Sequence, residues 1–298
     1  MTVEGVVVRA HGKFFIVHSH GKNITCKIRG RLRFKSHSVT PVAVGDDVIV
    51  TLESDGIGVI EQVEERRTVF FRAAKGLDSK RQTIAANLDQ LAVVVSTKNP
   101  GLKPGLIDRF LIVAAIGEMC PVIIINKVDL GEPAILAELV KGYANIDIPV
   151  LLTSAITGEG CHAVLNVLRE HRTILAGHSG VGKTALINRL IPGLNLMVGE
   201  VSDSSNRGIH TTSLVELFEL PTGGFVADSP GIKVLGLWKV EKADLAGYYP
   251  EMQKFLGECR FTGCSHTHEP DCAIKEAVRG GNIPRFRYEN YVAILDSL

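Results

Sequence analysis

The stretch Gly177-His178-Ser179-Gly180-Val181-Gly182-Lys183-Thr184 decides the fold of this chain. It matches the phosphate-binding loop pattern G-x-x-x-x-G-K-[ST] at every position, with an apolar segment, 173–176, before it and a helical pattern over 185–191 after it. Glycines let backbone N–H groups turn toward phosphates, and a helix N-terminus adds positive potential. The pattern therefore predicts that Lys183 reaches the β- and γ-phosphates of a nucleotide and that the Thr184 hydroxyl binds Mg²⁺. The alternative is a chance glycine-rich turn, which the strand, loop and helix together disfavour.

A second motif, Asn126-Lys127-Val128-Asp129, follows the apolar segment 121–125 and matches the guanine-recognition pattern N-K-x-D. The Asp129 carboxylate can only accept hydrogen bonds, and guanine presents two adjacent donors at N1 and N2. Adenine presents an acceptor at N1, so the same pocket would reject it. The Asn126 amide is predicted to meet the purine edge and the Lys127 stem to lie along the base face. The motif therefore predicts a preference for guanine.

Two shorter elements extend this set. Ser154-Ala155 follows another apolar segment and is predicted to be the second guanine-contacting loop. The segment 207–212, Arg-Gly-Ile-His-Thr-Thr, is polar and contains glycine, which suits a mobile switch. Its threonine would complete the Mg²⁺ shell, and Thr212 is preferred over Thr211 for that position.

The D-x-x-G pattern comes last, at Asp228-Ser229-Pro230-Gly231. Asp228 would hold Mg²⁺ through water, and the Gly231 N–H would sense the γ-phosphate. Base recognition thus precedes the phosphate loop, the reverse of ordinary GTPases. The same sheet forms if the old termini are joined and the chain is cut elsewhere. Residues 71–236 are therefore predicted to be an α/β P-loop GTPase domain with a circularly permuted motif order and a mostly parallel sheet.

Residues 1–70 carry short strand patterns separated by Gly, Asp, Ser or Pro, which predicts a small β-barrel. An OB-fold is the natural candidate, although the pattern alone does not separate it from an SH3-like barrel. The expected strands cover 3–9, 14–17, 23–35, 48–52 and 58–63.

One of these strands carries an unusual alternation of charge. A period of two places five cations on one face, with apolar residues on the other. Like charges on one face repel, so a nucleic-acid-binding face is favoured over an ordinary solvated one. The cations are Lys27, Arg29, Arg31, Arg33 and Lys35.

Residues 237–298 contain a cluster of metal-ligating side chains. Cys259, Cys264 and Cys272 lie close in sequence to His266 and His268, which compete for the fourth position. Three thiolates and one imidazole make a closed, structural Zn²⁺ site, so a small zinc-binding α domain is predicted. Buried cysteines without metal are the alternative. The basic and aromatic tail 285–291 either contacts RNA or packs.

Composition sets limits on the class of protein. The 298 residues carry a net charge of +1, so any basic surface must be local. No apolar run reaches membrane-spanning length, and the first residues lack a signal-peptide pattern. The sequence therefore predicts a cytoplasmic protein that has no membrane partner.

Taken together, the barrel, the permuted motif order, R-G-x-H-T-T, D-S-P-G and C-x4-C-x-H-x5-C closely resemble the bacterial family called ribosome small subunit-dependent GTPase A. The resemblance covers essentially the whole chain. It implies a late maturation factor of the 30S ribosomal subunit that is stimulated by that subunit, binds GTP and GDP and contacts 16S rRNA. A monomer is expected. It also implies that His266, rather than His268, is the zinc ligand. Ile209 stands where the family often has Arg.

The motifs do not fix which group orients the attacking water. Ile232 follows D-x-x-G where many GTPases place a water-orienting Gln, so slow unaided hydrolysis is expected. One hypothesis is that His210 orients the attacking water when the ribosome orders the switch. The other is that His210 only packs, and RNA or a potassium ion supplies the missing stabilisation. Rival functions are a GTP-gated RNA-binding module whose hydrolysis is incidental and a GTP-dependent RNA-modifying enzyme, for which no second catalytic constellation is visible.

Overall fold

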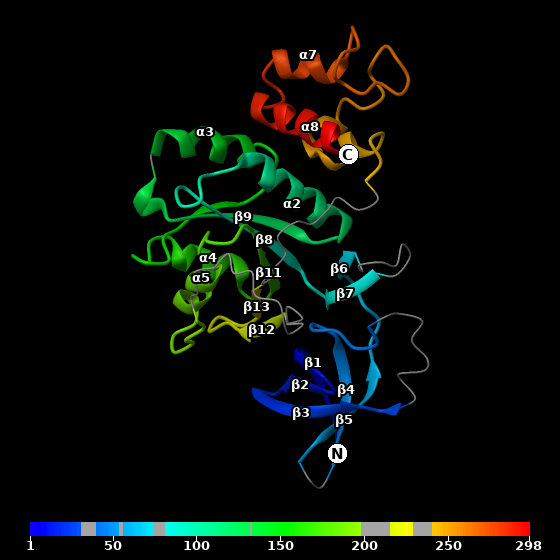
Figure 1. Ribbon diagram of the computed structural model, residues 1–298, viewed down its shortest axis with the longest axis vertical. Coiled ribbons are helices and arrows are strands. Elements are labelled where there is room, and N and C mark those ends of the chain that lie inside the picture. Colours follow the sequence, from blue (N-terminus) through cyan, green and yellow to red (C-terminus); the bar gives the residue numbers. More distant parts are fainter. Residues whose placement is uncertain (31–39, 54–55, 74–80, 132, 198–214, 229–239) are drawn as a thin grey trace, which may run out of the picture.

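The computed structural model describes residues 1–298 except 31–39, 54–55, 74–80, 132, 198–214 and 229–239. Figure 1 shows three parts along the long axis of the molecule. A small barrel lies at the N-terminal end, an α/β layer structure lies in the middle, and short helices lie at the opposite end.

The N-terminal part is a closed five-stranded barrel, as predicted. Strand β1 pairs with both β2 and β4, β3 pairs with β5, and β4 pairs with β5, which closes the order β1-β2-β3-β5-β4. Alternate residues such as Val17, Val48 and Val50 point into a shared core. The strands are β1 (Thr2–His11), β2 (Phe14–Ser19), β3 (Lys22–Ile28), β4 (Asp47–Leu52) and β5 (Gly58–Val63).

The prediction that the third strand continues to Lys35 is wrong. Strand β3 ends at Ile28, and the last ladder contact beyond it runs from the Arg29 N–H to the Ile60 carbonyl. Gly30, which follows, has no side chain to pack in a strand and weakens its continuation. The single face that carries five cations is therefore not formed by this strand.

The central part contains a mostly parallel sheet with helices on both faces. Its order is β10-β9-β8-β11-β13-β12, and the last of these six strands, β12, runs antiparallel to its neighbour β13 while the others run parallel. Every residue of β8 is buried, as a central strand requires. The strands are β8 (Gln90–Ser96), β9 (Cys120–Asn126), β10 (Val150–Leu152), β11 (Arg172–Ala176), β12 (Glu216–Glu219) and β13 (Phe225–Asp228).

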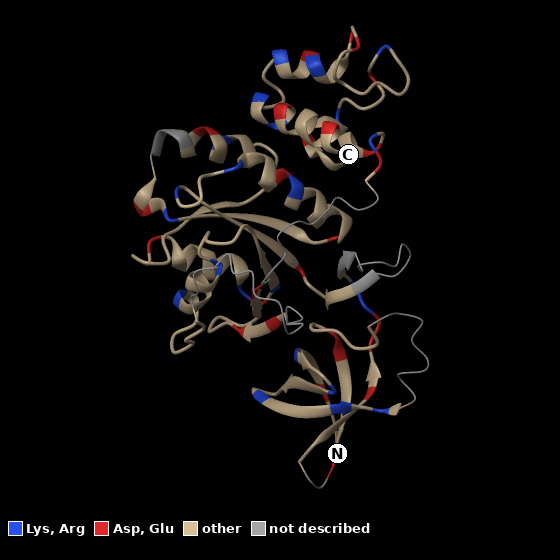
Figure 2. Cartoon of the chain, viewed as in Figure 1, with Lys and Arg blue, Asp and Glu red and all other residues tan. Residues whose placement is uncertain are grey.

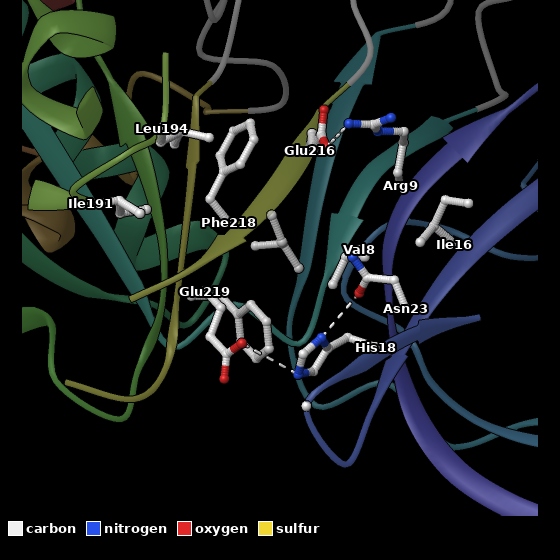
Figure 3. A pocket seen from close by; sticks show the side chains of 13 residues that line it. Val8, Arg9, Ile16, His18, Asn23, Ile191, Leu194, Glu216, Phe218 and Glu219 are labelled. Carbon is white, nitrogen blue, oxygen red and sulfur yellow. Dashed lines mark hydrogen bonds and ion pairs between the residues drawn. The ribbon is translucent and has the colours of Figure 1, made fainter. Parts of the chain in front are cut away.

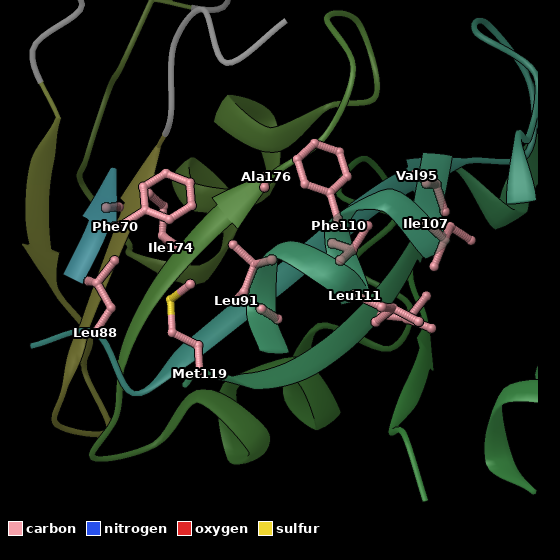
Figure 4. Packing of buried hydrophobic residues seen from close by; sticks show 14 of the residues in the cluster. Phe70, Leu88, Leu91, Val95, Ile107, Phe110, Leu111, Met119, Ile174 and Ala176 are labelled. Carbon is pink, nitrogen blue, oxygen red and sulfur yellow. The ribbon is translucent and has the colours of Figure 1, made fainter. Parts of the chain in front are cut away.

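Two apolar clusters attach the helices to this sheet. On one face α2 (Pro104–Ile116) and α3 (Pro133–Ala144) pack on the strands, and Figure 4 shows Ile107 of α2 beside Val95 of β8. On the other face α4 (Cys161–Leu168) and α5 (Lys183–Leu190) form the second cluster. The predicted α/β layer architecture is thus confirmed.

The barrel and the central sheet are continuous. Strand β12 pairs with β1 at Glu216 and Arg9, which joins the two into one eleven-stranded sheet. At the base of the sheet the Arg172 guanidinium donates to both carboxylate oxygens of Asp47, at 2.7 and 3.1 Å. A hairpin of β6 (Val69–Ala73) and β7 (Arg81–Ala86), which the sequence pattern does not predict, lies between the two parts in sequence.

The C-terminal part is helical and has its own core, to which Ile112 of α2 also contributes. Its elements are the 3₁₀ helix η2 (Leu245–Tyr248), α6 (Pro250–Gln253), α7 (Ala273–Arg279) and α8 (Arg285–Ser297). In the tail, Arg287 and Tyr291 are each only 1% exposed, so these two residues pack. Among the helices described, none combines the length and apolar character needed to cross a bilayer.

Candidate functional site

The carboxyl end of the parallel sheet brings the predicted GTP motifs together. Neighbouring strands place Asn126 beside Ser96 and Leu175 beside Asp228 in the ladders. The phosphate loop begins directly after β11, and Ser154 follows β10 by two residues. Because the strands are parallel, their carboxyl ends meet at one edge, which is where ligands bind in such sheets.

The phosphate loop requires glycine at two close approaches. Gly182 has a φ of 93°, and a Cβ there would lie 2.4 Å from Nδ2 of Asn126. A Cβ at Gly177 would lie 2.0 Å from the carbonyl oxygen of Val94. The obstacle at Gly177 is backbone, and at Gly182 the left-handed φ disfavours other residues, so this loop shape requires glycine at the first position and strongly favours it at the second.

The side chain of Lys183 folds back onto the phosphate loop. Its Nζ donates to the carbonyl oxygens of Gly177, at 3.0 Å, and His178, at 3.2 Å. Burial lowers the pKa of this ammonium below its ordinary value, while the Asp228 carboxylate opposes that shift. A partly buried cation beside a glycine-rich loop can bind phosphate oxygens.

Thr184 and Asp228 form the opposite side of this site. The Thr184 hydroxyl donates to Oδ2 of Asp228 at 2.8 Å. The other carboxylate oxygen, Oδ1, is buried and has no hydrogen-bond partner among the residues that the structure describes. A hydroxyl beside a carboxylate with a free, buried oxygen is the oxygen-rich donor set that Mg²⁺ prefers, so these residues fit the ion.

Asn126 ties the base motif to the two loops beside it. Its Nδ2 donates to the Val181 carbonyl at 2.9 Å, and its Oδ1 accepts from the Ala155 N–H at 3.1 Å. The Asn126 side chain, which is predicted to meet the purine edge, therefore links N-K-x-D to the phosphate loop and to Ser154-Ala155. One N–H remains for a purine.

Lys127 and Asp129 lie beyond that bridge. Lys127 has a left-handed φ of 62°, and its Nζ donates to the carbonyl oxygens of Gly180, at 2.7 Å, and Asn99. Asp129 is exposed in the 3₁₀ helix η1 (Val128–Leu130). Its carboxylate is therefore accessible to a base that enters from solvent.

Sequence reasoning missed the loop 97–103, which supports Lys127. The Thr97 hydroxyl donates to the Lys127 carbonyl at 2.5 Å, and the Ser96 hydroxyl donates to the Pro100 carbonyl at 2.7 Å. The signal was its position directly after a buried parallel strand, where functional loops gather. Three residues predicted for the GTP site, Thr212, His210 and Gly231, lie outside the part of the chain that the structure describes.

The C-terminal cluster brings Cys259, Cys264, His266 and Cys272 together, with their ligand atoms all within 4.8 Å of one another. Sγ of Cys259 lies 3.8 Å from Sγ of Cys272, and His266 Nδ1 lies 3.5 Å from each of those sulfurs. Tetrahedral zinc with Zn–S bonds of about 2.3 Å and Zn–N bonds of about 2.0 Å separates two sulfurs by about 3.8 Å, and a sulfur and a nitrogen by about 3.5 Å. The four residues therefore fit zinc, whereas the side chain of His268 is 84% exposed.

Replacement of Cys264 by Ser should weaken zinc binding at least about 100-fold, because one thiolate of four is lost. The C-terminal helices should also unfold at a lower temperature, since Tyr288 and Tyr291 donate to the carbonyls of His266 and Ser265 in the cluster loop. Native mass spectrometry of the metal content checks the first effect, and the exposed Cys120→Ser serves as the control. Full zinc occupancy in the Cys264 variant would remove that residue from the ligand set.

A separate pocket of about 490 Å³ lies on the seam between the barrel and β12. Figure 3 shows Arg9 paired with Glu216 at one end and His18 beside Glu219 at the other. None of the residues predicted to bind GTP lines this pocket. It belongs to the contact between the two parts of the eleven-stranded sheet.

These features define the class of protein: a P-loop GTPase fold whose base motif precedes its phosphate loop, with a barrel before it and a Cys/His cluster after it. Family models agree with this assignment. The RsgA N-terminal domain model matches residues 4–60, and the RsgA GTPase model matches residues 63–238. The chain therefore belongs to the RsgA GTPase family.

Individual relatives match over nearly the full length. The small ribosomal subunit biogenesis GTPase RsgA of Bacteroides fragilis (strain ATCC 25285) is 37% identical, with 99% of this chain and 96% of that protein covered. The protein of the same name from Moorella thermoacetica is 39% identical, with 98% and 96% covered. The crystal structure of YjeQ from Thermotoga maritima has a TM-score of 0.80 at 34% identity, with 100% of this chain and 99% of that chain covered. YloQ, described as a circularly permuted GTPase, has a TM-score of 0.76 at 29% identity, with 100% and 95% covered.

Proposed function

We propose that this protein hydrolyses GTP and acts as a late maturation factor of the small ribosomal subunit, with slow turnover that the subunit stimulates. The observation that carries the proposal is that Asn126 joins the base motif to the phosphate loop and to Ala155 at one sheet edge. The relatives that match over the full chain are named small ribosomal subunit biogenesis GTPases. A role in the maturation of small subunits supports a location in the cytoplasm, and we propose that the protein acts there as a monomer.

Each end of the nucleotide has a proposed set of residues. Asp129 accepts hydrogen bonds from guanine N1 and N2, with the Lys127 stem along the base and Ser154-Ala155 at the base oxygen. The loop N–H groups and Lys183 bind the phosphates, and the Gly231 N–H senses the γ-phosphate. Mg²⁺, which neutralises developing phosphate charge, would be held by Thr184, Thr212 and, through water, Asp228.

The Cys/His cluster is proposed to hold one structural zinc ion. Its donors are three sulfurs and one nitrogen, which leave no open position for a substrate. The ion would fix the loop 259–272 against α8, because tyrosines of α8 donate to carbonyls of that loop. The cluster thus shapes the C-terminal part and takes no part in hydrolysis.

The barrel is proposed to contact 16S rRNA through cations of β3 and of the segment that follows it. Figure 2 shows basic residues along β3, where Lys22 and Lys27 are exposed. Arg29 already pairs with Glu61 at 2.9 Å. Arg31, Arg33 and Lys35 fall in 31–39, outside the described residues. Lys27 is therefore the cation with the best structural support for phosphate contact.

The experiment that tests this function compares GTP turnover with and without purified small subunits. A rise of at least about 100-fold on addition of small subunits, and none on addition of large subunits, is expected if the subunit orders the catalytic site. Equal turnover in both conditions, with RNA binding that still depends on the nucleotide, would favour the alternative of a GTP-gated binding module.

The His210→Ala variant tests which group orients the water. If His210 acts in the subunit-bound state, stimulated kcat should fall about 100-fold while GDP affinity stays the same, because a positioned proton-transfer group contributes that much to catalysis. Turnover with saturating small subunits measures it, and the exposed His162→Ala on α4 is the matched control. Unchanged stimulated turnover would assign the stabilisation to RNA or a potassium ion.

A further inference from the structure

A buried ion cluster joins the C-terminal part to the GTPase part. Arg287 of α8 is 1% exposed and donates to Asp108 of α2, which is fully buried. Its Nε and Nη2 donate to the two carboxylate oxygens of Glu251, at 2.6 and 3.2 Å. Tyr143 of α3 donates to Asp108 at 2.7 Å. Four elements from two parts of the chain therefore meet at one guanidinium.

The charges in this cluster make it sensitive to the loss of Arg287. Burial raises the pKa of Asp108, and the nearby guanidinium is the strongest effect that opposes this rise. Arg287 also stacks on Tyr249, with 4.5 Å between the guanidinium carbon and the ring centroid. Without the guanidinium, two carboxyl groups would remain buried, and among the described residues Tyr143 and Asn290 would be the remaining side-chain donors to one of them, Asp108. Removing one partner of a buried pair is more harmful than replacing all partners by apolar groups.

Helix α2 reaches from this cluster to the nucleotide site. The helix starts at Pro104, directly after the loop 97–103. At the other end of that loop, Asn99 accepts from the Lys127 ammonium, which also donates to Gly180 of the phosphate loop. The Cδ atom of Pro100 lies 3.6 Å from the position of a Cβ on Gly180. The loop before α2 thus contacts both the base motif and the phosphate loop.

Helix α8 also packs directly against α3 and α2. A Cβ on Gly142 of α3 would lie 2.4 Å from the Phe286 ring, so α8 sits directly on that backbone. Arg109 of α2 donates to the Ser297 hydroxyl at 2.6 Å, and Figure 1 shows α8 above α2. A shift of α8 must therefore shift α2 or break these contacts.

We propose that Arg287 is a positioning residue for the guanine nucleotide. From the C-terminal part it fixes α2, and through the loop 97–103 it holds Lys127 and Gly180 in the geometry that binds GTP. The residue touches neither substrate nor metal. This inference rests on the proposed GTP site and adds that the C-terminal part sets nucleotide affinity.

The Arg287→Met variant tests the proposal in the full-length protein. The dissociation constant of GDP and the KM for GTP should each rise at least about fivefold while kcat changes little, because ground-state positioning is lost. The exposed Arg285→Met, on the same helix, should change neither. Combining Arg287→Met with Asp108→Leu and Glu251→Met should restore affinity, since no buried charge is left unpaired. A folded Arg287→Met protein with wild-type GDP affinity would overturn the proposal.

A second measurement uses the unaltered protein and does not depend on the stability of a variant. Because coupling between sites is reciprocal, GDP should slow amide hydrogen exchange in α8 (Arg285–Ser297) as well as in α2. Unchanged exchange in α8 with GDP bound would contradict the inference and leave the proposed function intact. Failure of the wild-type protein to bind GDP would instead contradict the proposed function.

Discussion

Replacement of Lys183 by Ala should lower kcat/KM for GTP at least about 100-fold, the loss typical when one preorganised donor to a developing charge is removed. The reason lies in the geometry of the loop. The Lys183 ammonium is held by the carbonyls of Gly177 and His178, at 3.0 and 3.2 Å, beside the glycines that admit the phosphates. Alanine leaves the loop N–H groups in place but removes the positive charge between the β- and γ-phosphates.

Steady-state turnover over a range of GTP concentrations measures this effect. The exposed Lys141→Ala on α3 removes the same charge from the surface of the same domain and should leave turnover unchanged. The thermal midpoint of the Lys183 variant should also stay close to that of the unaltered protein, because the hydrogen bonds that its ammonium makes among the described residues run to two carbonyls of its own loop. A stable Lys183→Ala protein with normal GTP turnover would show that the phosphates bind elsewhere.

The GTP motifs were predictable because each is local in sequence. The phosphate loop and N-K-x-D are each continuous, and an apolar strand pattern before each one predicts its place at the edge of a parallel sheet. Residues Cys259 to Cys272 are also close in sequence, so their clustering needed no knowledge of tertiary structure. Permutation was visible for the same reason, because the order of local motifs can be read directly.

The contacts between parts of the chain were not predictable in this way. Asp108 and Arg287 are 179 residues apart, and no sequence pattern pairs them. The tail 285–291 has the composition of an RNA-binding segment, yet its Arg287 is buried. The guanidinium pairs with the carboxylates of Asp108 and Glu251 and lies over the rings of Tyr143 and Tyr249. A signal existed in α2, where Asp108 interrupts an apolar stripe that includes Ile107 and Leu111, because an acid in that position requires a buried partner.

The end of strand β3 at Ile28 was not predictable for a different reason. Alternation from Lys27 to Lys35 has the period of a strand, but a period does not show where pairing stops. Strand β5 pairs with β3 only as far as Ile28, and beyond it Arg29 turns to Glu61. The end of a strand depends on its neighbour, which a single segment does not contain.

Replacement of Asp129 by Asn should lower affinity for GDP at least about 100-fold and move the preference to xanthosine nucleotides. The asparagine amide donates where the carboxylate accepted, which clashes with the guanine N2 amine but matches the xanthine oxygen at that position. The exposed Asp147→Asn, which removes the same charge elsewhere in the domain, should alter neither affinity.

Hydrolysis of XTP by this variant tests most directly whether the base motif and the phosphate loop act on one nucleotide. The Asp129→Asn protein should hydrolyse XTP at close to the rate of the unaltered protein with GTP, and adding Lys183→Ala should abolish that activity. Retained preference for GTP in Asp129→Asn, or XTP hydrolysis that survives the loss of Lys183, would show that the two motifs do not share a ligand.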